Sequence, residues 1–343
     1  MDIIQPPRVY NTIGYELYNT LITPVKPYLI SDRVVISPDN LLSYLPFETL
    51  PVSDIDTEDL YYSRIDYLME ELDISYTYSA TFLDENRKRD YQAESTAIAF
   101  APDYSEPVDI QSLFQRRQQT GNTLADIPFA KKEAEYVSEL LGGKLLMNEF
   151  ARESAYKSEA GNYKIIHLAM HTVLDDTDPM YSTLIFSPEK TGEEDRFLRT
   201  FEIYGVPLKS RMVVLSSCNT GSGKLYSGEG ILSLARGFIY SGSESVVMSM
   251  WEIEDRTGTE IVKSYYDNLK KGYSKSMSLR KARMKFLKTA DQLRAHPYFW
   301  STLVIYGDNS ALFRPVWILP LTISLILLIF SLTFYYLRKR MYS

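Results

Sequence analysis

One apolar strand and the polar turn after it organise the chain: Arg211-Met212-Val213-Val214-Leu215-Ser216-Ser217-Cys218-Asn219-Thr220-Gly221. The β-branched first half predicts a buried strand, and Asn-Thr-Gly is typical of a loop that leaves a strand. Cys218 stands at this exit and is the only cysteine among 343 residues. A lone cysteine is most often a small buried hydrophobic residue, so Cys218 by itself identifies no chemistry.

His171 gives Cys218 a partner, because it also follows an apolar run, residues 164–170. Ligands of open parallel sheets bind beyond the carboxyl ends of the strands, so neighbouring strands would bring the two side chains together. An imidazole that takes the thiol proton leaves a thiolate able to attack a carbonyl. Gly221 and Gly223 allow tight turns whose backbone N–H groups suit an oxyanion site. The order His before Cys, roughly 50 residues apart, is also the caspase spacing, although the caspase sequence around the nucleophile is absent.

Apolar strands alternate with helices over the rest of the chain, which predicts an α/β fold with a mainly parallel sheet covered on both faces. We expect one domain over residues 1–310, with a long polar surface loop at 103–128. The helix at 130–141 should end on Gly142-Gly143. The expected strands are 33–36, 95–102, 164–170, 182–187, 212–217, 245–250 and 301–306, and the other helices lie within 1–30 and at 230–240, 257–269 and 276–290.

Composition excludes several classes of protein. The net charge is −7 and the pI about 5.2, so no nucleic-acid partner is expected. One cysteine excludes an intrachain disulfide framework. The first residues carry neither a basic nor an apolar signal region, so no signal peptide is predicted.

Residues 316–337 carry no charge and are rich in Leu and Ile, which predicts a single transmembrane helix. A helix of this length spans roughly 33 Å at about 1.5 Å per residue. Residues 311–315 form a short linker before it, and a basic tail, 338–343, follows. The basic tail favours a cytoplasmic C-terminus with the domain outside, yet no export signal precedes that domain. Membrane sidedness therefore stays open, between a tail-anchored chain and the C-terminal part of a longer exported protein.

A metal site is the less favoured interpretation of the histidines. His167 and His171 would share one face only in a helix, whereas the residues around them favour a strand. The glutamate of the usual helical zinc motif is replaced by Leu168. His296, before Pro297, is expected to fix a turn.

Several stretches together resemble the CHAT domain, a caspase- and separase-like family of cysteine peptidases. The resemblance covers nearly all of residues 10–309 in order. Its main motifs are His167-Leu168-Ala169-Met170-His171-Thr172, Leu215-Ser216-Ser217-Cys218-Asn219-Thr220-Gly221, Gly228-Glu229-Gly230-Ile231, Ser249-Met250-Trp251-Glu252 and His296-Pro297-Tyr298-Phe299-Trp300.

The resemblance implies a caspase-like three-layer sandwich with a dyad of His171 and Cys218. It also implies oxyanion donors at the backbone N–H of Cys218 and near Thr172, a protein or peptide substrate, and no metal or organic cofactor. CHAT domains commonly follow helical repeats, so a helical-repeat regulatory partner is expected. The family usually has glycine where this chain has Thr172.

Two loops near the predicted site are acidic and could line a pocket for a basic substrate side chain: Asp175, Asp176 and Asp178 follow His171, and Glu252, Glu254 and Asp255 follow the strand 245–250. Asp255 is the candidate, although solvated loop carboxylates are the commoner explanation. The resulting function is a membrane-anchored cysteine endopeptidase. The alternative is a catalytically silent CHAT domain that serves as a protein-interaction module at the membrane.

Overall fold

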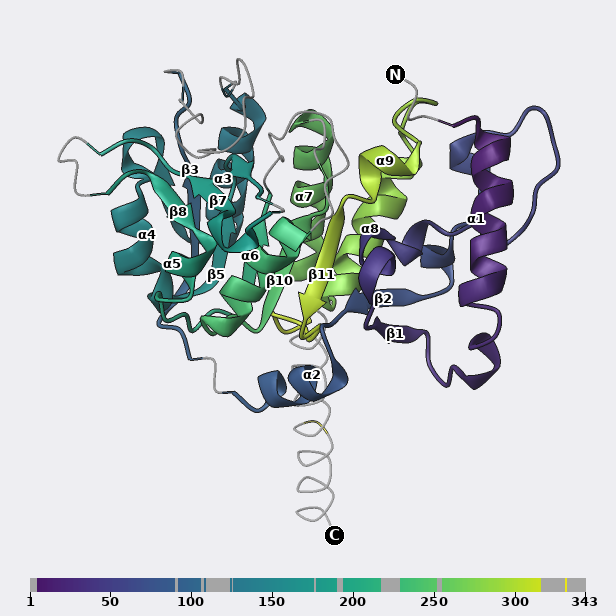
Figure 1. The fold of residues 1–343 in the computed structure, drawn as a ribbon, viewed down its shortest axis with the longest axis horizontal. Helices are drawn as coiled ribbons and strands as arrows, with labels where there is room; N and C mark the ends of the chain where they lie inside the picture. The colour runs from purple at the N-terminus through teal and green to yellow at the C-terminus, as the bar shows by residue number, and fades with distance from the viewer. Residues whose placement is uncertain are drawn as a thin grey trace, which may run out of the picture.

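An eight-stranded sheet forms the centre of the computed structural model (Figure 1). The structure describes residues 5–89, 92–105, 108, 124, 126–175, 177–189, 194–216, 229–251, 255–315 and 331, the side chains of 229–232 and 255 excepted. The strand order is β1-β2-β11-β10-β9-β5-β3-β4. The bounds are β1 Arg33–Ile36, β2 Asp73–Tyr76, β3 Ser95–Ala101, β4 Lys144–Met147, β5 Tyr163–Leu168, β9 Met212–Leu215, β10 Ser245–Ser249 and β11 Leu303–Gly307.

Neighbouring strands of this sheet are parallel except β10 and β11, so the predicted α/β fold with a mainly parallel sheet is confirmed. The antiparallel pair divides the sheet into two parallel blocks of opposite direction. β10, β9, β5, β3 and β4 share one direction, so their carboxyl ends lie at one edge. In Figure 1 the arrowhead of β11 points to the opposite, lower edge.

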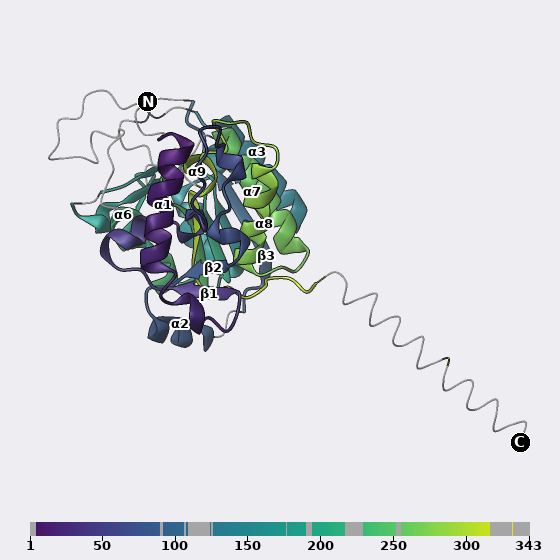
Figure 2. The same ribbon diagram turned by 90° about the vertical axis from the view of Figure 1, so that its right-hand side faces the viewer.

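Helices cover both faces of the sheet. α3 (Pro128–Leu141), α7 (Asp255–Lys270) and α8 (Lys275–Leu287) pack side by side on one face (Figure 2). Residues of α1 (Pro7–Leu21), α4 (Glu153–Glu159) and α6 (Glu229–Tyr240) contribute to the core on the other face. The expected helices thus form, and α3 ends at Gly142 with a left-handed φ of 63°. The remaining helices are α2 Ala80–Arg87, α5 Thr200–Ile203 and α9 Pro297–Trp300.

The strand predicted at 182–187 does not join the parallel sheet. It forms as β7 (Thr183–Ile185) in a separate antiparallel sheet, between β6 (Thr172–Val173) and β8 (Phe197–Arg199). Its three residues are fully buried, and a buried apolar run has the same appearance in either kind of sheet. Periodicity could therefore predict the strand but not its partners.

Two predictions lie mostly outside the described residues. Most of the expected loop 103–128 and all of the span 316–337 except Ser331 belong to this group. Among the helices that the structure describes, none is long and apolar enough to cross a membrane.

Candidate active site

β5 and β9 are adjacent and parallel, as the dyad hypothesis requires. Ile165 pairs with Met212, and Leu168 at the end of β5 pairs with Leu215 at the end of β9. The Ser216 N–H donates to the Leu168 carbonyl oxygen at 3.1 Å, which extends the pairing one step past the strand ends. His171 stands three residues after Leu168, and Cys218 three residues after Leu215. Cys218 itself lies outside the described residues.

His171 is held by its backbone and its ring. Its N–H donates to the hydroxyl oxygen of Tyr104 at 3.0 Å, and its carbonyl oxygen accepts from the Ile185 N–H at 3.0 Å. The Tyr104 and His171 rings meet edge to face, with centroids 4.5 Å apart. The imidazole is therefore fixed from two directions at the carboxyl end of β5.

Tyr104 is a site residue that sequence reasoning missed. Its hydroxyl also donates to the Ile185 carbonyl oxygen at 2.6 Å, so it connects His171 to β7. Burial raises the pKa of this phenol, which keeps the hydroxyl protonated and able to donate. Tyr104 follows the strand 95–102, and only the pairing of β3 with β5 brings it near His171. No local motif would have indicated that contact.

Thr172, the residue placed where the family usually has glycine, begins β6 and pairs with Leu184. It is 2 % exposed. The backbone at this position is thus fixed by the small antiparallel sheet beside His171.

His167 does not join His171. Its Nδ1 lies 3.1 Å from the Tyr266 hydroxyl and its Nε2 lies 3.0 Å from a carboxylate oxygen of Glu133. Both partners come from α7 and α3, the helices on the face away from Tyr104 and β7. Residues 163–168 form a strand rather than a helix, so the two histidines are not a metal pair.

The candidate carboxylates for a substrate pocket come from the loop after His171 and from the start of α7. Asp255 is the first residue of α7, and its side chain is outside the described residues. Asp175 accepts from the N–H groups of Thr177 and Asp178, at 2.8 and 3.0 Å, so it stabilises its own turn. His296 fixes a turn as predicted, because its Nδ1 accepts from the Tyr298 N–H at 3.0 Å and caps α9.

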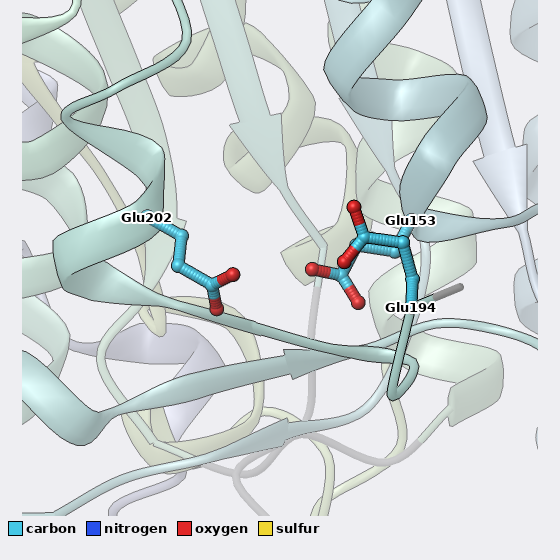
Figure 3. A group of neighbouring side chains, drawn as sticks. All are labelled: Glu153, Glu194 and Glu202. Atoms are coloured by element: carbon cyan, nitrogen blue, oxygen red, sulfur yellow. The ribbon is translucent and has the colours of Figure 1, made fainter. Parts of the chain in front are cut away.

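One cluster of carboxylates in the described part of the chain has the spacing of a metal site. Glu153, Glu194 and Glu202 place oxygens within 4.8 Å of one another (Figure 3). The Lys157 ammonium lies 2.8 Å from Glu153 and 3.0 Å from each of the other two. Although burial lowers it, the three carboxylates hold the pKa of Lys157 above its ordinary value. Lys157 already supplies the positive charge that a metal ion would bring.

Comparison with known proteins places these features in a family. Residues 12–308 match the family described as CHAT domain. "Tetratricopeptide repeat protein 28" of Mus musculus and of Homo sapiens are each 24% identical over 220 residues, which cover 55% of this chain. The chain spans 9% of the length of these curated relatives.

Three solved structures are also similar. The Saccharomyces cerevisiae separase–securin complex gives a TM-score of 0.41 at 15% identity, over 72% of this chain and 14% of that one. The Arg-specific cysteine proteinase gingipain R gives 0.43 at 11% identity, over 91% and 70%. The complex of Porphyromonas gingivalis RgpB pro- and mature domains gives 0.44 at 10% identity, over 89% and 69%. All three TM-scores are below 0.5, so we infer nothing further from them. The family match, in contrast, covers most of the chain, and the protein belongs to the CHAT domain family.

Proposed function

We propose that the protein is a cysteine endopeptidase in which Cys218 is the nucleophile and His171 the general base. One observation carries the proposal: β5 and β9 are neighbours in register, and His171 and Cys218 follow their paired ends by the same number of residues. Cys218 is two residues beyond Ser216, and two residues span at most about 7 Å. We therefore expect its thiol to stay within reach of this strand end.

The proposed reaction uses only groups of this chain and water. The His171 imidazole takes the Cys218 proton, and the thiolate sulfur bonds to the scissile carbonyl carbon. Backbone N–H groups of Cys218 and near Thr172 stabilise the oxyanion. The C–N bond then breaks as the imidazolium protonates the leaving amine. Water, deprotonated by His171, hydrolyses the thioester and releases the thiol.

Anchoring in a membrane is part of the proposal and rests on the uncharged residues 316–337. The helical-repeat partner rests on the names of the curated relatives. Asp255 is proposed to contact a basic substrate side chain, because it begins α7 at the edge where β5 and β9 end.

The competing function is a CHAT domain that binds proteins without cleaving them. The burial of the predicted base favours this function, because a general base must reach its substrate and His171 is only 4 % exposed.

Labelling of the single cysteine separates the two functions. A peptidyl chloromethylketone should modify Cys218 in the full chain at least tenfold faster than in His171→Ala, because only the parent has a base to form the thiolate. His167→Asn is the matched control, since it alters a nearby histidine, within β5, that faces Glu133. Equal labelling of the parent and His171→Ala would exclude the peptidase and leave the binding module.

A further inference from the structure

The linker predicted at 311–315 is not a free tether, because it packs on the domain. Leu312 is 4 % exposed and belongs to the core beneath α7 and α8. The Lys164 ammonium donates to the Leu312 carbonyl oxygen at 2.7 Å. It also lies 5.3 Å from the centre of the Phe313 ring, and the Lys270 ammonium lies 5.1 Å from the same ring. Phe313 is therefore held by a cation–π contact from each of two elements.

Further contacts hold the residues on either side. The Asn309 side chain accepts from the Ser276 N–H at 2.7 Å, and Arg211 donates to the Ser310 hydroxyl at 2.8 Å. Gly272, with a φ of +90°, is so close to Pro315 that a Cβ would lie 2.5 Å from its Cα. The domain thus fixes the chain as far as Pro315, the residue before the predicted span.

Four cationic side chains belong to this docked segment or lie next to it, and we call them the basal face: Lys164, Lys270, Lys271 and Arg314. Lys164 and Lys270 contact Phe313, Arg314 is part of the segment, and Lys271 precedes Gly272, which lies against Pro315. None of them forms an ion pair with a carboxylate in the part of the chain that the structure describes. The whole protein carries a net charge of −7, so the charge of the basal face is opposite in sign to that of the protein as a whole. Burial, with Arg211 nearby, lowers the pKa of Lys164, whereas Lys270, Lys271 and Arg314 are exposed.

The basal face lies at the end of the sheet opposite to His171. α7 begins at Asp255 and ends at Lys270, and its 16 residues span about 24 Å at 1.5 Å per residue. Its second turn contacts the start of α3, where the Thr259 hydroxyl donates to the Phe129 carbonyl oxygen at 3.3 Å. Its last residue lies over Phe313, beside Lys164 near the amino end of β5.

We propose that the basal face rests on the anionic phospholipid headgroups of the membrane in which residues 316–337 are anchored. This inference rests on the membrane anchoring of the proposed function, but not on the peptidase activity. No undocked residue separates Pro315 from the predicted span, so the domain meets the bilayer surface in one orientation. Cations at that surface are attracted by anionic lipid. His171 then lies roughly 20 Å above the headgroups, the length of six strand residues, and the substrate approaches from the aqueous side.

Lysine acylation of the full chain in lipid nanodiscs tests this contact. The discs contain phosphatidylcholine alone or with phosphatidylserine, and tandem mass spectrometry reads each lysine separately. Lys132 is the matched reference, because it is exposed, its ammonium lies 5.0 Å from the centre of the Phe129 ring, and it belongs to the second turn of α3 at the other end of the sheet.

We expect the labelling rate of Lys270 and Lys271, relative to Lys132, to fall about fivefold in phosphatidylserine discs. This factor corresponds to about 1 kcal/mol for each cation near anionic lipid. The difference should vanish at 1 M salt, where the Debye length is about 3 Å. A ratio that is the same in both lipids would refute the basal face while leaving the anchor intact. Extraction of the chain from lipid at alkaline pH would refute the anchor, and the basal face with it.

Gly272→Ala tests whether the docked segment sets the orientation. A Cβ at this position should displace Pro315, so the variant should remain in the disc but lose the lipid-dependent protection of Lys270. Gly142→Ala is the control, because Gly142 also has a positive φ but no atom lies within 4 Å of its added Cβ. Undiminished protection in Gly272→Ala would overturn the role of the docked segment. Circular dichroism establishes that both variants are folded.

Discussion

Tyr104→Phe is the sharpest test of how the candidate base is held. The substitution keeps the ring that packs edge to face on His171 but removes the hydroxyl between His171 and β7. Two hydrogen bonds are lost, one from the His171 N–H and one to the Ile185 carbonyl oxygen. Both groups belong to the connection that fixes the imidazole at the end of β5.

The expected loss of stability follows from the two buried groups that lose their hydrogen-bond partner, the His171 N–H and the Ile185 carbonyl oxygen. A buried polar group deprived of its partner costs about 1–3 kcal/mol, so the two groups left by Tyr104→Phe should lower the free energy of unfolding by about 2–6 kcal/mol. If about half of that cost is relieved by movement of the His171 backbone, the productive imidazole position loses about 1–3 kcal/mol. Since about 1.36 kcal/mol corresponds to a factor of ten in rate, Cys218 should react about 5- to 150-fold more slowly at neutral pH.

Alkylation of Cys218 by iodoacetamide measures this loss, and the chain has no other cysteine to obscure it. The pH profile of the rate should also move toward the pKa of a free thiol, about 8.5, because the thiolate loses its imidazolium partner. Tyr156→Phe is the matched control, since Tyr156 is fully buried and its hydroxyl has no hydrogen-bond partner among the described residues. A folded Tyr104→Phe variant with the parent's rate and pH profile would refute the positioning role.

Three further substitutions test the charged and polar groups around the sheet. Burial raises the pKa of Glu153 to about 7 from 4.5, so the folded state retains its proton and the parent loses stability as the pH rises from about 5 to 7. Between these pH values, chemical denaturation should show the free energy of unfolding of the parent fall by about 3 kcal/mol, whereas that of Glu153→Gln should not change. The same dependence on pH in both proteins would contradict this prediction. Arg283→Met leaves the buried Glu48 carboxylate, 3.0 Å from the guanidinium in the parent, without its cation and should cost about 3–5 kcal/mol in chemical denaturation. A loss below about 1 kcal/mol would show that Glu48 becomes protonated or solvated at little cost. His167→Ala should lower the free energy of unfolding by about 2–4 kcal/mol because it leaves Glu133 unpaired, yet Cys218 should be labelled normally in the folded variant. A labelling loss as large as that of His171→Ala would identify His167 as the base instead.

The long periodic elements were predictable because their residues decide them locally. The apolar spacing in 130–141 and the Gly142 that follows predict α3 and its end, and the run in 212–217 predicts β9. β4 and β2 were missed, because their residues, Lys-Leu-Leu-Met and Asp-Ile-Ser-Tyr, lack the Val-Val pair of the equally short β1 and β9. The partners of β7 were also beyond prediction, since strand pairing depends on contacts between distant parts of the chain.

The candidate site could be predicted to the extent that it depends on strand ends. His171 closely follows β5 in the sequence. In an α/β sheet, a parallel neighbour such as β9 commonly ends at the same edge, which brings the residues after the two strands together. Tyr104 could not be predicted, because its contact with His171 joins residues 67 positions apart through a hydroxyl. The docking of Phe313 between Lys164 and Lys270 is of the same kind. A pattern of charge along the chain does not show which cations will surround one ring.

The two histidines of β5 and its exit show why the surroundings of a side chain, rather than its type, decide its chemistry. The imidazole of His167 lies within hydrogen-bond distance of Glu133 and Tyr266 through its two nitrogens, and it is fully buried. A base must exchange a proton with its substrate, so a ring engaged at both nitrogens is suited to holding α3 and α7 on the sheet. The backbone of His171, by contrast, is held by Tyr104 and Ile185 beyond the carboxyl end of β5. That end is paired with the end of β9, the strand that leads to Cys218. This position beside β9, rather than the presence of an imidazole, makes His171 the candidate base.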